Sequence, residues 1–406
     1  MTMPRVKIKS QSIAAIEGEL LKRVRSHGQI SRVALSRELQ IVPSTAGIYV
    51  NRLIAEDFLV ESRKAEPGLG RPATLLALNP AGGRFVGVDF EARNLMATAV
   101  DFSQQPLRRV HKTIQATDSV AQILEKMERA IREVMAGDPR QVLGIGVGVP
   151  GVIDPAHGVA VRYDLIKGWQ DIPLGERLRK KFGAPVFLEN NIRCMALAEL
   201  WFGGGRRLKD FICLGVRSGI AAGVVVNGHL LRGAGNQAGE IGHWSTPVPA
   251  GLNQAGASGR NGKFLWQPGA RLEQVASLAA ILSLAQRTKH ARQKTALSAV
   301  NGELSAADLF QAVRAGDAYA CSLIESVAWV HGWVVHQLCA LFDTRKIIFT
   351  GPLVELEDFF FSRVRAAATQ WGGTKTAVEI TGSALGTYNG ALGAAALALH
   401  QWKPKR

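Results

Sequence analysis

The sequence has no long uninterrupted run of apolar residues. With glycine counted as apolar, the longest covers ten of the 406 residues, positions 390–399, whereas a helix needs about 20 to span a bilayer. No apolar stretch follows the basic residues near the N-terminus, so the sequence does not indicate a secretory signal peptide. These absences predict a soluble, cytoplasmic protein that makes no contact with a membrane.

Cysteines are few and widely spaced. Cys194, Cys213, Cys321 and Cys339 each lie in an apolar segment, and no pair has the short spacing of a zinc knuckle or a redox motif. We therefore expect buried free thiols, with no metal site and no cofactor.

Acidic residues are outnumbered by basic ones. The chain has 49 Lys and Arg against 33 Asp and Glu, a net charge of +16, which favours a polyanionic partner. Of this charge, +5 lies within residues 1–80, which contain 12 basic and 7 acidic side chains. The length and the 47% hydrophobic content allow two or three domains that each bury a core.

The first eighty residues predict a winged helix-turn-helix. Apolar residues at three- and four-residue intervals indicate a helix over 12–26; they are Ile13, Ile16, Leu20 and Val24. Ser31 is expected to cap a second helix that ends at Leu39, with Val33, Leu35 and Leu39 facing inward. Ser44 is expected to cap the third helix, and the tight connection between the last two makes a helix-turn-helix.

A two-stranded wing follows. Residues 58–62 and 73–78 read as strands on either side of a Gly- and Pro-rich turn at 67–72. The third helix is then expected to enter the major groove. Its candidate DNA contacts are Ser44, Thr45, Tyr49, Asn51 and Arg52. Arg71, at the tip of the wing, is the candidate for the minor groove. The alternative is a three-helix module that binds another protein.

After residue 80 strands alternate with helices, which predicts an α/β layer architecture. The expected helix covers 120–136. The expected strands cover 85–90, 96–101, 142–149, 185–188, 211–216, 223–226 and 346–350.

Five short motifs occur in a fixed order along this part of the chain. They are the Gly-rich segment 144–151 followed by Val-Ile-Asp, Leu-Glu-Asn-Asn at 188–191, Ala-Gly-Glu-Ile-Gly-His at 238–243, Thr-Gly-Pro-Leu at 350–353, and the glycines and alanines of 384–395. In this order they resemble the ROK (repressor, open reading frame, kinase) family. With the helix-turn-helix in front, the resemblance is to regulators of the NagC/XylR type and covers nearly the whole chain.

The resemblance implies a two-lobed, actin-like ATPase fold with a sugar cleft between the lobes. The first lobe would cover 81–190, completed by about 385–406, and the second 191–384. The positions that contact sugar hydroxyls in the family correspond to Asn190, Asn191, Glu240, His243 and Glu273.

Three departures from a kinase of this family stand out. The first phosphate turn reads Glu91-Ala92-Arg93 without the family's glycines, and the second contains Arg217. The family's catalytic Asp is replaced by Asn191, and an amide cannot accept a proton at neutral pH. Three cysteines of the family's zinc site correspond to Phe264, Trp266 and Arg271.

We interpret the chain as a sugar-responsive transcriptional regulator, a repressor whose kinase-like body binds a sugar without phosphorylating it. It is expected to form a homodimer or homotetramer, because a single winged helix reads too few base pairs of an operator. One alternative is an active sugar kinase with an accessory DNA-binding domain. Another is a regulator that is controlled by a protein partner and binds no small molecule.

Overall fold

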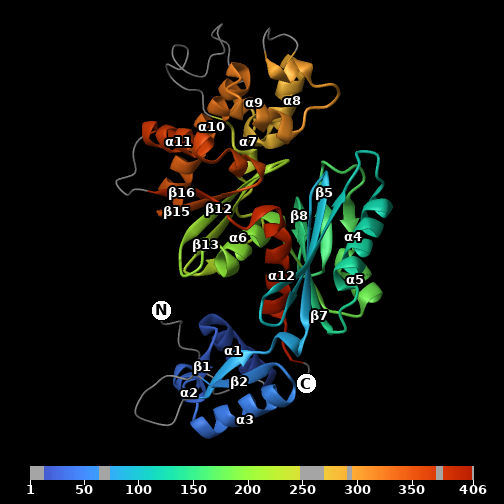
Figure 1. The fold of residues 1–406 in the computed structure, drawn as a ribbon, viewed down its shortest axis with the longest axis vertical. Helices are drawn as coiled ribbons and strands as arrows, with labels where there is room; N and C mark the ends of the chain where they lie inside the picture. The colour runs from blue at the N-terminus through green and yellow to red at the C-terminus, as the bar shows by residue number, and fades with distance from the viewer. Residues whose placement is uncertain (1–12, 64–73, 247–268, 290–294, 372–377, 405–406) are drawn as a thin grey trace. The chain divides into compact units, whose positions relative to one another are not determined.

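The computed structural model describes residues 13–63, 74–246, 269–289, 295–371 and 378–404, which form two compact units (Figure 1). The first unit comprises residues 1–189 and 394–406, and the second comprises residues 190–393. Each contains one five-stranded sheet. Within the described ranges, no helix combines the length and the apolar character needed to cross a membrane.

The first unit begins with a winged helix-turn-helix. Its helices are α1 (Ile13–His27), α2 (Arg32–Leu39) and α3 (Pro43–Ala55), and its strands are β1 (Ile30–Ser31), β2 (Leu59–Arg63) and β3 (Thr74–Leu78). Ser31 caps α2 as predicted, because its Oγ accepts a hydrogen bond of 3.2 Å from the N–H of Ala34. The three predicted helices and the two predicted strands are confirmed. The short strand β1, which pairs with β3, was not foreseen.

Two local expectations for this region are wrong. Ser44 does not cap α3, which begins at Pro43 after Val42 and has no side-chain cap; the fixed φ of proline suits the first helical position. Val33 does not face inward but is 53% exposed, whereas Leu35 is buried. Helical positions two apart lie on opposite sides of the axis, so Val33 and Leu35 cannot share a buried face.

The body of the first unit is a mixed sheet in the order β11-β7-β4-β5-β6. Its strands are β4 (Arg84–Phe90), β5 (Asn94–Asp101), β6 (Pro106–Thr113), β7 (Val142–Val149) and β11 (Val186–Asn190). A separate small sheet consists of β8 (Val152–Asp154), β9 (Val159–Arg162) and β10 (Gln170–Ile172). The predicted strands of this region are confirmed, while β6 and the small sheet were not foreseen.

Helices cover both faces of this sheet. Val86, Val88 and Ile145 share a buried cluster with side chains of α4 (Val120–Met135) and α5 (Leu174–Phe182). Alternate residues of a strand point to opposite faces, and on the other face a Cβ at Gly146 would lie 1.8 Å from the carbonyl oxygen of Ala394. Glycine at this position therefore lets α12 (Asn389–Gln401) lie directly on β7.

The winged helix packs against the body of its own unit. The ring of Phe58 lies 5.1 Å from that of Phe102 and 5.0 Å from that of Trp402. Nearby, Nη1 of Arg25 lies 3.4 Å from Nδ1 of His400. Phe58, just before β2, and Arg25, in the last turn of α1, thus connect the winged helix to Phe102 and to the C-terminal end of α12.

The second unit repeats the sheet of the first. Its order is β14-β13-β12-β15-β16, where the strands are β12 (Phe211–Val216), β13 (Ile220–Val226), β14 (His229–Leu230), β15 (Lys346–Thr350) and β16 (Glu379–Gly382). In both sheets three consecutive strands pair antiparallel, and a parallel strand then joins beside the first of them. This duplicated topology is that of the actin-like ATPase fold, as the sequence predicted.

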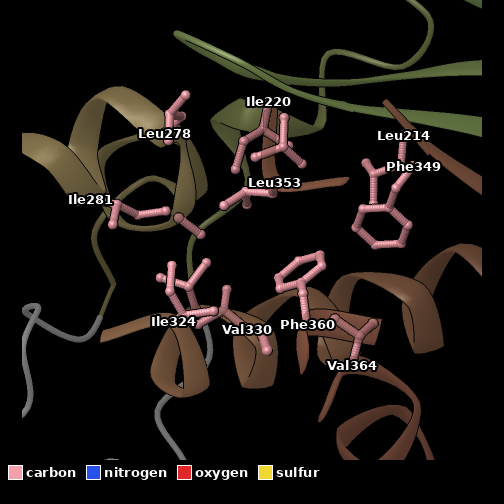
Figure 2. Close-up of a cluster of buried hydrophobic side chains, with 14 of the residues drawn as sticks. Leu214, Ile220, Leu278, Ile281, Ile324, Val330, Phe349, Leu353, Phe360 and Val364 are labelled. Atoms are coloured by element: carbon pink, nitrogen blue, oxygen red, sulfur yellow. The ribbon is translucent and has the colours of Figure 1, made fainter. Parts of the chain in front are cut away.

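Helices also cover both faces of the second sheet. One face packs on α6 (Asn191–Phe202), and the other packs on α10 (Ala318–Phe342) and α11 (Glu357–Gln370). Figure 2 shows part of this second core, in which Leu214 and Phe349 from the sheet lie opposite Phe360 and Val364 from α11. The helices α7 (Leu272–Ala276), α8 (Leu278–Thr288) and α9 (Ala306–Arg314) complete the unit.

Candidate ligand and DNA-binding sites

The first group of candidate ligand residues lies where β11 ends and α6 begins. Asn190 is 3% exposed and caps α6, since its Oδ1 accepts a hydrogen bond of 3.1 Å from the N–H of Ile192. Its Nδ2 donates to Oε1 of Glu240 at 3.4 Å. Asn191 follows as the half-buried first residue of α6. The amide of Asn190 therefore links the helix start to the loop that carries Glu240.

That loop is fixed by a glycine in the left-handed region. Gly239 has φ of +90°, and a Cβ there would lie 1.8 Å from the carbonyl oxygen of Ala222. The carbonyl of Gly239 accepts a 2.8 Å hydrogen bond from the N–H of Ala222 in β13. The close approach of these two backbones positions Glu240 beside Asn190.

The carboxylate of Glu240 lies in a partly desolvated environment. Burial raises its pKa, and the charge of Glu273 acts in the same direction, while Arg193 and His243 oppose the shift. Arg193 is 1% exposed, and its Nη1 donates to the carbonyl of Asn236 at 2.9 Å. The sequence interpretation missed Arg193, although it lies one helical turn after Asn190.

His243 and Glu273 form a second pair. Nδ1 of His243 lies 3.7 Å from Oε1 of Glu273, which sits in the first turn of α7. Nη1 of Arg271 lies 3.5 Å from the same nitrogen of His243. Arg271 is one of the three positions at which the family resemblance predicts a zinc-binding cysteine, and here it contributes a cation. The other two, Phe264 and Trp266, lie outside the described residues.

All five candidate ligand residues belong to the second unit, and four of them form the contacting pairs Asn190–Glu240 and His243–Glu273. The electrostatic effects of His243 and Glu273 on Glu240 link the two pairs into one group. Amides, carboxylates, imidazole and guanidinium groups provide both donors and acceptors. This group can therefore bind a ligand that carries several hydroxyl groups.

The two turns that the sequence predicts as counterparts of the kinase phosphate turns each contain an internal backbone hydrogen bond. The N–H of Glu91 donates to the carbonyl of Asn94 at 2.9 Å in the first unit. In the second unit the N–H of Arg217 donates to the carbonyl of Gly219 at 2.9 Å, within the β12–β13 hairpin. Phosphate-binding turns point such N–H groups at the anion, and these two are used within their turns.

The solvent side of α3 carries the candidate DNA contacts. Ser44 and Asn51 are exposed, whereas Thr45 and Tyr49 are half-buried. Arg52 is held from two sides, because its Nη1 lies 3.4 Å from Oε1 of the fully buried Glu17 and its guanidinium lies 6.0 Å from the centre of the Tyr49 ring. Arg52 thus also ties α3 to α1. Arg71 lies outside the described residues.

A family comparison matches residues 85–401 to the model described as the ROK family. The chain belongs to the ROK family. Among ROK proteins, it is 26% identical over 357 residues to the xylose repressor of Caldicellulosiruptor bescii, covering 86% of each chain. It is 26% identical over 349 residues to the DNA-binding transcriptional repressor Mlc of Escherichia coli, covering 85% of this chain and 82% of that one. A further Caldicellulosiruptor relative matches at 31% identity over 57% of its own length.

Two solved ROK structures share the fold. A transcriptional regulator described as a homologue of the Escherichia coli Mlc protein superimposes with a TM-score of 0.75 at 22% identity, and covers 96% of both chains. The ROK glucokinase of Streptomyces griseus, determined in complex with glucose and AMPPNP, superimposes with a TM-score of 0.67 at 25% identity. It covers 78% of this chain and 99% of the glucokinase. The likeness to the regulator therefore extends over more of this chain than the likeness to the kinase.

Proposed function

We propose that the protein is a sugar-responsive transcriptional repressor that binds operator DNA through its winged helix. The observation that carries this proposal is the winged helix-turn-helix that precedes a ROK body. With this arrangement the chain matches a ROK regulator over 96% of both chains. The relatives that match most of its length and are named as repressors support the same reading. The basic charge of the first eighty residues suits the phosphate backbone of DNA.

The effector is a monosaccharide or a sugar derivative bound at the second unit by Asn190, Asn191, Glu240, His243 and Glu273. The two contacting pairs and the buried Arg193 support this assignment, because a sugar ring needs fixed donors and acceptors at several points. Removing one member of such a group leaves its partners without hydrogen bonds. This makes the group sensitive to single substitutions.

The body has lost kinase catalysis. Asn191 stands at the position of the family's catalytic Asp, and an amide cannot act as general base. The self-closed turns at Glu91 and Arg217 support the same conclusion for nucleotide binding. A sugar that binds to this body is therefore not phosphorylated and can act as an effector.

The protein acts as a homo-oligomer, with two winged helices on paired half-sites about 34 Å apart or a multiple of that distance. One winged helix contacts few base pairs, so two are needed for useful affinity and specificity. Light scattering of the purified protein should give at least twice the 43.7 kDa mass of one chain.

The proposal is tested by selecting DNA duplexes from a random pool and measuring their release as sugars are added. A sugar library is first screened by thermal shift, since a ligand at 100 times its dissociation constant stabilises by about 2.7 kcal/mol. The sugar that stabilises the protein most should change its affinity for the selected duplex at least tenfold. Failure to select any duplex, or a stabilising sugar without effect on DNA binding, contradicts the proposal.

The variant Asn51→Glu places a negative charge on the exposed face of α3. It should weaken DNA binding by at least tenfold, while its melting temperature and its sugar-induced shift stay as in the wild type. Gln170→Glu, which introduces the same negative charge at an exposed position of β10 in the body, is the matched control and should bind DNA normally. Equal DNA affinity of the two variants would mean that α3 has been wrongly assigned to the DNA.

A further inference from the structure

The recognition helix α3 carries an exposed apolar residue at the centre of its solvent side. Ile48 is 60% exposed and lies four residues after Ser44 and three before Asn51, which are also exposed. Residues spaced by three and four share one helix face. The opposite face of α3 is complete without Ile48, since Ala46, Val50 and Leu53 fill it.

A second observation concerns the residue beside it. Gly47 lowers the stability of the helix by about 1 kcal/mol relative to alanine. Neither packing nor backbone conformation requires glycine here, because a Cβ at Gly47 would meet no atom within 4 Å and the φ of Gly47 is not positive. Glycine also serves where another molecule approaches the backbone closely. The bare backbone at Gly47 lies next to the projecting side chain of Ile48.

The surroundings of Ile48 favour DNA over a protein partner. Ile48 is the one exposed large apolar side chain of α3, and Val33 in α2 and Val42 before α3 are also exposed. Three such side chains, in a domain with 12 basic and 7 acidic residues over positions 1–80, make too small a patch for a protein interface. In the major groove the only exposed methyl group of the four standard bases is that on C5 of thymine. An isoleucine flanked by hydrogen-bonding side chains is suited to that edge.

We propose that Ile48 reads the 5-methyl group of a thymine in each half-site of the operator, and that Gly47 allows the helix backbone to approach the groove closely enough for this contact. The inference rests on the proposed function, because it assumes that α3 enters the major groove. It adds a specificity-determining residue that contributes sequence preference without a hydrogen bond.

The test uses the duplex selected by the wild-type protein and replaces each thymine in turn by deoxyuridine. This substitution removes only the methyl group and keeps base pairing and all hydrogen-bonding groups. With the full-length wild-type protein, one thymine position in each half-site should show an affinity loss of about fourfold, the effect expected for one buried methyl group. Replacement in both half-sites together should cost about fifteenfold.

The variant Ile48→Ala should bind the unmodified duplex more weakly and show no further loss at that same thymine position. Because Ile48 is exposed, the melting temperature of this variant should remain that of the wild type. Val60→Ala, which truncates another exposed apolar residue, in β2, is the matched control and should keep the full deoxyuridine effect. Gly47→Ala should raise helix stability yet weaken binding to the selected duplex.

The outcomes distinguish a failure of the thymine contact by Ile48 from a failure of the proposed function. If the wild type binds its selected duplex but Ile48→Ala keeps every deoxyuridine effect of the wild type, Ile48 does not read thymine and the inference is overturned, while the proposed function stands. If no thymine position is sensitive to loss of its methyl group, the inference is overturned in the same way. If the wild type selects no duplex at all, both fail.

Discussion

Replacing Gly239 by alanine should release the loop that carries Glu240. A Cβ at this position would lie 1.8 Å from the carbonyl oxygen of Ala222, whereas real Cβ contacts are essentially never shorter than 3.0 Å. The two backbones must therefore separate by more than about 1 Å, which is incompatible with the 2.8 Å hydrogen bond from Ala222 to Gly239. The φ of +90° adds strain of about 1–2 kcal/mol for a residue with a side chain.

The shift also moves Glu240 away from Asn190, whose Nδ2 lies 3.4 Å from its carboxylate. Losing the alignment of one member of a buried polar group costs on the order of 1–3 kcal/mol. Gly239→Ala should therefore lower the affinity for the effector sugar by roughly ten- to a hundredfold. Isothermal titration calorimetry with the sugar that stabilises the wild type most in the thermal-shift screen measures this directly.

Gly235→Ala is the matched control in the same loop. Gly235 has no positive φ, and a Cβ there would meet nothing within 4 Å, so sugar affinity and melting temperature should both remain those of the wild type. If Gly239→Ala binds the sugar within twofold of the wild type, the loop does not position the ligand carboxylate, and the site has been placed wrongly.

Three further predictions concern a buried histidine, kinase activity and zinc content. Burial lowers the pKa of His331 in α10 from 6.5 to about 4, although its Nε2 contacts the carbonyl of Ala276 at 3.1 Å. The unfolded chain therefore binds more protons below pH 6.5, and the free energy of unfolding should fall by up to about 1.4 kcal/mol per pH unit from pH 6.5 towards pH 4. Denaturant titrations should show a shallower fall for His331→Gln, and equal slopes would contradict the cause. The variant Asn191→Asp should form no sugar phosphate at ordinary kinase rates of about 1–100 per second, and metal analysis of the wild type should find well under one zinc per chain. Sugar-dependent ATP turnover at such rates in either protein would favour the kinase alternative.

The sequence determined the order and type of most elements, because their signals are local. The apolar spacing of Ile16, Leu20 and Val24 produced α1, and Ser31 capped α2. The Gly-rich strand at 142–149 needed only its own apolar and small residues to be recognised. The ordered motifs carried the family assignment in the same way, since each is a short stretch of chain.

Tertiary structure decided which side chains meet. Three contacts depend on the packing of separate elements. Asn190 reaches Glu240 across fifty residues, Arg193 lies buried near them, and Arg52 binds Glu17. Tertiary structure also decided that Val33 and Ile48 stay exposed, because burial depends on which helix face the neighbouring elements cover. Local sequence sets backbone preferences within a few residues, whereas contacts between distant residues arise only when sheets and helices bury their apolar faces together.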